Sequence, residues 1–151
     1  MKAVDSFIQN DIIPLGIISF EFIKTIEAAD AVREIWGDTG LAAAGISLGL
    51  DFLYIPLYSV IIFILLQITS EKAVVVSLKL GKTISGVTYL SPLAGLFDVV
   101  ENIALIQVIL GSRNALWPET AYYFATTKFL VLAICLVTLI AGWFLIKLKR
   151  N

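Results

Sequence analysis

The segment at residues 90–110 constrains this chain most, because it is apolar enough for a lipid bilayer yet carries three polar side chains near its middle. Asp98, Glu101 and Asn102 stand three and four residues apart, a spacing that places them on one face of a helix. A charged side chain at the centre of a spanning helix costs about 2.5–3.5 kcal/mol on insertion scales. We therefore expect this face to turn inward, towards other helices, water or a ligand.

The composition supports a membrane protein with a single domain. Of the 151 residues, 59% are hydrophobic and 15% are charged, whereas soluble domains are about 45–50% apolar and about 25% charged. The net charge of −1 offers no electrostatic basis for binding nucleic acid. Histidine is absent, which argues against His-ligated haem, His-bound zinc and His-based catalytic triads. The single cysteine, Cys135, lies in an apolar run and is expected to be a packed core residue. We expect no cofactor and no metal.

Three long apolar segments predict an all-α membrane bundle with spanning helices at residues 41–68, 84–110 and 121–146. The first would be about 42 Å long as a helix, against a hydrocarbon core of about 30 Å, so it should tilt or protrude. Between the first two spans, residues 73–80 are predicted to form a short interfacial helix. The loop at 111–119 places Pro118 near the start of the last span.

Residues 7–36 are predicted to form embedded or interfacial helices. The apolar run at 7–23 is short and is broken by Asn10, Asp11 and Pro14, and residues 15–23 are expected to dip into or pack against the bundle. The hydroxyl of Thr25 is expected to cap a second helix at 26–36, and Gly37 is a natural stop.

The helix at 26–36 is amphipathic, and its apolar side consists of Ala28, Ala29, Val32, Ile35 and Trp36. We expect this helix at the membrane interface, with Trp36 as its anchor. A fully spanning first helix, giving four spans, is the alternative. The charged residues between Glu21 and Glu34 argue against it.

Lysine placement predicts the orientation of the spans. Three lysines follow the first span and three basic residues follow the last one, whereas the loop at 111–119 offers only Arg113. The positive-inside rule therefore predicts that the C-terminal tail at 147–151 is cytoplasmic. We expect the membrane to be a plasma membrane. If the N-terminal segment crosses, Lys2 is inside as well. The basic residues on the cytoplasmic side are Lys72, Lys79, Lys82, Lys147, Lys149 and Arg150.

The first span carries one charge, Asp51, which shares a helix face with Tyr54 and Tyr58. Gly45 and Gly49 form a GxxxG pattern on a different face and predict close approach of another helix. Pro56 is expected to bend this helix locally.

Depth arithmetic predicts that polar groups from three helices meet. Measured from the outer ends of their spans, Asp51, Glu101 and Lys128 all lie about 13–17 Å deep, and Asp98 and Tyr54 lie near 20 Å. We expect Asp51 near Glu101 and Lys128, and Tyr54 near Asp98. Lys128 is either the counter-charge of the acids or a side chain that snorkels to the interface.

Asn102 and Tyr58 complete this predicted cluster, with Tyr54 placed near Asn102 as well. Three acids against one lysine leave excess negative charge. Either a carboxyl group is neutral, or a cation enters, or the N-terminal segment contributes through Lys24 or Arg33. Glu21 is a further contributor.

Three short motifs carry a resemblance. The sequences GIISFE at 16–21, LDFLYIPLYS at 50–59 and AGLFDVVEN at 94–102 together resemble a family of small, uncharacterised multi-span membrane proteins. The resemblance implies a multi-span helical fold and no known activity. A looser similarity is to EXPERA-type four-helix proteins, which use intramembrane acids facing a lipid-like ligand. This chain lacks the histidine expected of their isomerase members, which leaves ligand binding open.

Three functional hypotheses follow. The first is a non-catalytic membrane protein, either an accessory subunit or a binder of an apolar ligand, whose core is organised by the acidic cluster. The second is a proton or cation transporter that uses Asp51, Asp98 and Glu101 and works as an oligomer. The third, an enzyme that modifies lipid through Asp98 and Glu101, lacks a nucleophile or an activated-water site. The expected partners are membrane lipid and either another membrane protein or further copies of this chain.

Overall fold

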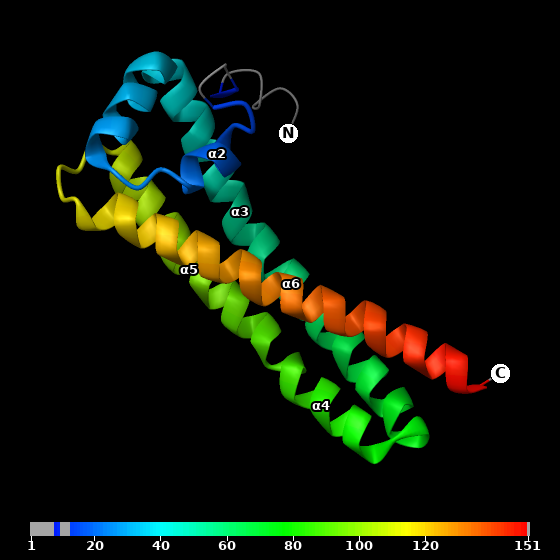
Figure 1. The fold of residues 1–151 in the computed structure, drawn as a ribbon. Coiled ribbons are helices and arrows are strands. Elements are labelled where there is room, and N and C mark those ends of the chain that lie inside the picture. Colours follow the sequence, from blue (N-terminus) through cyan, green and yellow to red (C-terminus); the bar gives the residue numbers. More distant parts are fainter. Residues whose placement is uncertain (1–7, 10–12, 151) are drawn as a thin grey trace. The chain divides into compact units, whose positions relative to one another are not determined.

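The protein is all helical in the computed structural model, which describes residues 8–9 and 13–150, with no strand among them. Three stretches are long and apolar enough to cross a membrane: Ile26–Val76, Leu78–Ile109 and Leu116–Lys149. The predicted all-α bundle is therefore confirmed, whereas Lys2, Phe7, Asn10 and Asp11 lie outside the described residues. The helices, in chain order, are α2 (Ile17–Glu21), α3 (Ile26–Val76), α4 (Leu78–Thr88), α5 (Leu90–Ile109) and α6 (Leu116–Arg150) (Figure 1).

The chain forms two compact units. Unit 1 comprises Met1–Tyr54 and Phe97–Thr126, and unit 2 comprises Ile55–Leu96 and Thr127–Asn151. Each unit has its own cluster of buried hydrophobic side chains. Helices α3, α5 and α6 contribute to both units.

The start of α3 in unit 1 follows the predicted signals closely. The backbone N–H of Ala28 donates to Thr25 Oγ1 over 3.3 Å, so Thr25 caps this helix end. Gly37 interrupts the helix with φ 54° and ψ −169°, a conformation that glycine adopts without the strain of a Cβ atom. Figure 1 shows that the chain turns back at this point, so residues 26–36 form a separate arm before the long part of α3.

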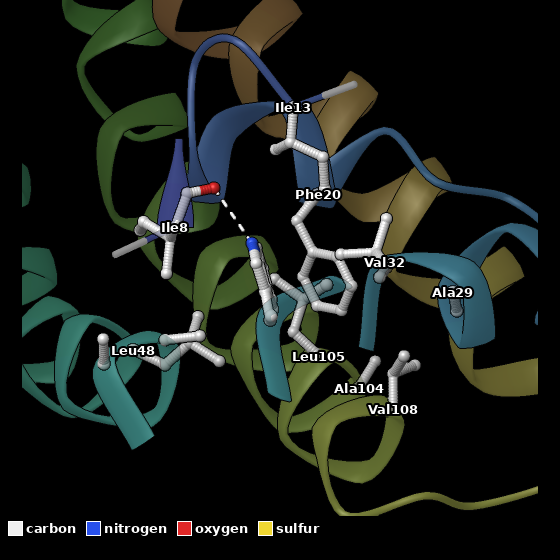
Figure 2. Close-up of a cluster of buried hydrophobic side chains, with 13 residues drawn as sticks. Ile8, Ile13, Phe20, Ala29, Val32, Leu48, Ala104, Leu105 and Val108 are labelled. Atoms are coloured by element: carbon white, nitrogen blue, oxygen red, sulfur yellow. Dashed lines mark hydrogen bonds between the residues drawn. The ribbon is translucent and has the colours of Figure 1, made fainter. Parts of the chain in front are cut away.

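The N-terminal part of unit 1 packs into a hydrophobic core rather than spanning a membrane. Helix α2 has five residues, too few to cross a bilayer, and its Phe20 is fully buried. Figure 2 shows Phe20 among Val32 of α3 and Ala104 and Leu105 of α5. This agrees with the expectation that residues 15–23 pack against the bundle.

Trp36, predicted to anchor its helix at the membrane interface, belongs to this core. Its side chain is 6% exposed and its ring centroid lies 4.8 Å from that of Phe20. The indole N–H donates to the backbone carbonyl of Ile8 over 2.9 Å, which Figure 2 marks with a dashed line. A buried indole needs a partner for its N–H, and the N-terminal segment provides it.

Within unit 2, a tight turn separates α3 from α4 at Ser77, so the single helix predicted at 73–80 is wrong. Helix α3 continues to Val76, and extended Ser77 ends it. Ser77 Oγ then accepts from the backbone N–H of Leu80 and caps α4. A serine side chain competes for backbone hydrogen bonds, which favours a helix boundary at this position.

The predicted second span is also interrupted. Helices α4 and α5 are separated at Tyr89, one residue after Thr88 ends α4. Pro92 stands four residues after Thr88, and a proline neither donates to the carbonyl four residues earlier nor leaves room for it. Pro92 therefore favours a new helix start, a signal that was present in the sequence.

Glycines allow close helix contacts in unit 2, but at different positions from the predicted GxxxG. A Cβ atom on Gly95 would stand 2.4 Å from Ser59 Oγ, and Ser91 Oγ donates to the carbonyl of Ser59 over 2.7 Å. By contrast, nothing lies within 4 Å of a Cβ atom built on Gly45 or Gly49. The GxxxG pattern of α3 therefore makes no close contact with the described part of the chain.

Candidate functional site

The polar side chains of α5 lie on its buried face. Glu101 and Asn102 are fully buried and Asp98 is 4% exposed. The opposite face carries Val100 and Ile103, which are 37% and 45% exposed. Helix α5 therefore turns its apolar side outward and its polar side inward, as the cost of exposing carboxylates to lipid requires.

Asn102 joins α5 to α3 within unit 1. Its Nδ2 atom donates a hydrogen bond to Asp51 Oδ2 over 2.7 Å. An ionised carboxylate only accepts hydrogen bonds, so the amide nitrogen is the end of Asn102 that suits it. At 2.7 Å this bond is at the short end of the range for N–H···O hydrogen bonds, so it links the two helices closely.

The other end of the Asn102 amide points away from this bond and has no hydrogen-bond partner among the described residues. The Oδ1 atom is buried, and a buried acceptor without a donor costs about 1–3 kcal/mol. The amide thus combines one strong bond to Asp51 with one acceptor that is available to a donor.

Two tyrosines of α3 belong to the predicted cluster. Tyr54, which is predicted to lie near Asp98 and Asn102, belongs to unit 1 together with them, and its side chain is 59% exposed. It stands three residues after Asp51, on the same side of α3. Tyr58 belongs to unit 2 and is half-buried.

Lys128 also belongs to unit 2 and is only 5% exposed. Its Nζ lies 4.7 Å from the ring centroid of Phe129, the next residue in α6. A lysine that snorkels along the outside of its helix keeps its ammonium group in water. The burial of Lys128 does not fit that hypothesis.

Lys24, proposed as a further contributor, is engaged elsewhere in unit 1. Its Nζ lies 4.8 Å from the ring centroid of Tyr123 and 5.2 Å from that of Tyr122, in cation–π geometry. A hydrogen bond with Tyr123, followed by the charge interaction with the same side chain, raises the pKa of Lys24 above its ordinary 10.5. Glu21, the other proposed contributor, is 6% exposed at the end of α2.

Arg33, the other cation considered for the cluster, serves the end of α5 instead. Its Nε donates to the carbonyl of Ile109, the last residue of α5, over 3.3 Å. A positive side chain at a helix C-terminus satisfies a free carbonyl and opposes the helix dipole. Arg33 also pairs with Asp30 over 3.2 Å, and Arg113 pairs with the same carboxylate.

These ion pairs border an open polar hollow of about 380 Å³ in unit 1. Its walls carry both charges, and no residue of the Asp51–Asn102 region lines it. Sequence reasoning did not find this hollow, although the spacing of Asp30 and Arg33 by three residues was a local signal. The lining residues are Asp30, Arg33, Glu34, Gly37, Asp38, Leu41 and Arg113.

No group of three or more Cys, Asp or Glu side chains among residues 8–9 and 13–150 is arranged to hold a metal ion. The chemistry that the buried site offers is therefore that of carboxylate and amide oxygens from α3 and α5. Such groups can hold helices together, accept a donor from a ligand, or bind and release protons.

Comparison of this chain with protein-family models, with curated proteins and with solved structures gives no match.

Proposed function

We propose that this chain is a multi-pass membrane protein without catalytic activity, which acts as an accessory subunit or binds an apolar ligand inside the bilayer. The observation that carries this proposal is the 2.7 Å hydrogen bond from Asn102 to Asp51. It uses two polar groups of the predicted cluster to join α3 and α5, which is a structural task. Interhelical hydrogen bonds of this kind are a common means of holding membrane helices together.

The outward faces of the helices support a partner or ligand within the membrane. Leu53 of α3 is 72% exposed, and Val137 and Ile140 of α6 are 65% and 67% exposed. In a bilayer such side chains contact lipid tails or another membrane helix.

The topology belongs to the same proposal. The three long helices cross a plasma membrane, and the lysines around α4 and at the end of α6 mark the cytoplasmic side. The C-terminus is then cytoplasmic.

Native mass spectrometry after gentle solubilisation, with the lipid retained, tests the proposal. An accessory subunit is expected to carry a second membrane protein at fixed stoichiometry, and a ligand binder is expected to be a monomer with a defined small mass. A matched assay in proteoliposomes should show no proton or cation flux above that of empty vesicles. A homo-oligomer that conducts ions would contradict the proposal.

Transport of protons or a small cation is the second candidate function. It is favoured by the burial of Asp98 and Glu101, one turn apart on the same face of α5. In that case wild-type protein conducts in proteoliposomes, and Glu101→Gln folds normally but loses the flux. Flux that persists in Glu101→Gln would rule this candidate out.

A further inference from the structure

The charges of this chain are divided very unevenly between its two units. Unit 2 contains one of the twelve acidic residues, Glu71, and seven of the eleven basic residues. A charge asymmetry of this size within one chain indicates interaction with a charged surface.

Five of these basic residues are exposed lysines that gather where α3, α4 and the end of α6 pack together. The packing is defined by Ala73, Ile84 and Ile146, which share one buried cluster. Each of these three residues stands within two positions of an exposed lysine. We call this group the basic surface; it consists of Lys72, Lys79, Lys82, Lys147 and Lys149.

The helices beneath the basic surface are closely packed. A Cβ atom on Gly81 would stand 2.3 Å from a side-chain atom of Val74, so α3 and α4 pack in close contact at the turn. Ser70 Oγ donates to the carbonyl of Gly81 over 2.9 Å, and the same turn carries the Ser77 cap. The lysines of α4 therefore project from a fixed helix rather than from a loose loop.

Trp143 indicates the level at which the basic surface meets a membrane. Its side chain is 60% exposed, and Lys147 Nζ lies 5.2 Å from the centroid of its ring. Exposed tryptophan is typical of the headgroup level, with apolar side chains on the bilayer side and lysine on the aqueous side. Helix α6 follows this order, because exposed Val137 and Ile140 precede Trp143 and the lysines follow it.

We propose that the basic surface binds the phosphate groups of anionic phospholipids and gathers them around unit 2. The lysine ammonium groups are compact positive charges, and a juxtamembrane lysine near an anionic leaflet contributes favourable attraction that zwitterionic lipids do not provide. Glu71 is the one acidic residue in unit 2 that opposes this attraction. The proposal requires that the chain be embedded in a bilayer, but it is independent of whether the chain is an accessory subunit or a transporter.

Quenching of Trp143 by brominated lipids tests the proposal in vesicles that contain the full chain. The probe lipids are dibrominated phosphatidylglycerol and dibrominated phosphatidylcholine, each as a minor component of phosphatidylcholine vesicles. The Trp143→Phe variant gives the signal of the other tryptophans, which is subtracted. We expect about two- to fivefold stronger quenching by the anionic lipid at low ionic strength, and a smaller preference in high salt.

Charge variants provide the controls. The triple variant Lys79→Gln, Lys82→Gln, Lys149→Gln should lose the preference while keeping Lys147 beside Trp143. Lys24→Gln in unit 1 should keep it, and Glu71→Gln should strengthen it. Equal quenching by the two lipids in wild-type protein, or a preference that the triple variant retains, would overturn the proposal. Because the readout concerns lipid alone, ion flux or a bound partner protein has no bearing on it.

Discussion

Asn102 of α5 donates a hydrogen bond to Asp51 of α3 over 2.7 Å, so the contact between these helices in unit 1 includes a bond to a carboxylate as well as apolar packing. Asn102 is fully buried and Asp51 is half-buried. The bond joins a fully buried amide to a half-buried carboxyl group, so its removal should lower the stability of unit 1.

Replacing Asn102 by leucine should destabilise the protein by roughly 1–3 kcal/mol, because the hydrogen bond that Asn102 donates to the partly buried Asp51 is lost. Asp51→Asn should cost less, since an amide oxygen still accepts from Asn102. The double variant Asp51→Leu, Asn102→Leu should recover much of the loss, because it replaces both partners of the hydrogen bond by apolar side chains. Thermal unfolding in detergent measures these changes. Gln67→Leu, at an exposed position of α3, is the matched control, and purely additive single effects would contradict the prediction.

Gly95→Ala should destabilise unit 2 by about 1–3 kcal/mol, because its new Cβ atom would stand 2.4 Å from Ser59 Oγ. The next nearest atoms lie at 3.4 Å and 3.5 Å, which is ordinary contact. Ser59→Ala removes the obstructing oxygen, so the double variant should unfold close to the wild-type temperature. Gly86→Ala has open space and controls for the helix propensity of alanine. If the double variant were no more stable than Gly95→Ala, the close contact would not be the cause.

Gly37→Ala should cost on the order of 1–3 kcal/mol, although nothing lies within 4 Å of the added methyl group. The cost is conformational, because φ 54° with ψ −169° is a region that residues with a Cβ atom avoid. Gly49→Ala adds a methyl group to the same helix in open space and should be neutral or slightly stabilising. Equal unfolding temperatures for the two variants would be inconsistent with the turn at Gly37.

The contribution of Lys24 to the stability of the folded chain should change with pH in the alkaline range. Its pKa is raised in the folded chain by Tyr123, so its contribution is fully present below the ordinary pKa of 10.5 and is lost as the pH rises through the folded value. The difference in melting temperature between wild type and Lys24→Gln should therefore be constant at neutral pH and shrink above that value. Tyr123→Phe removes the hydroxyl group that raises the pKa of Lys24. In that background, the difference in melting temperature should therefore begin to shrink at a lower pH. A difference that grew with pH would have the wrong sign.

Much of the helical architecture could be predicted from local sequence. The three long apolar segments, the cap at Thr25 and the stop at Gly37 all depend on residues close in the chain and on the cost of placing polar groups in lipid. The inward face of α5 follows from the same cost, because exposing Asp98 and Glu101 to lipid would be unfavourable whatever the neighbours are. Each of these features depends only on one segment of the chain and on the solvent or lipid around it.

The pairing of side chains was decided by the tertiary structure. Depth along a helix predicts Tyr54 near Asn102 and Asp51 near Glu101, but it does not predict that Asn102 donates to Asp51. Similarly, Gly95 rather than Gly45 makes a close contact with another helix. Trp36 likewise found its partner in the carbonyl of Ile8, far away in sequence. Which face of a helix meets which neighbour depends on how all the helices pack, and no single segment carries that information.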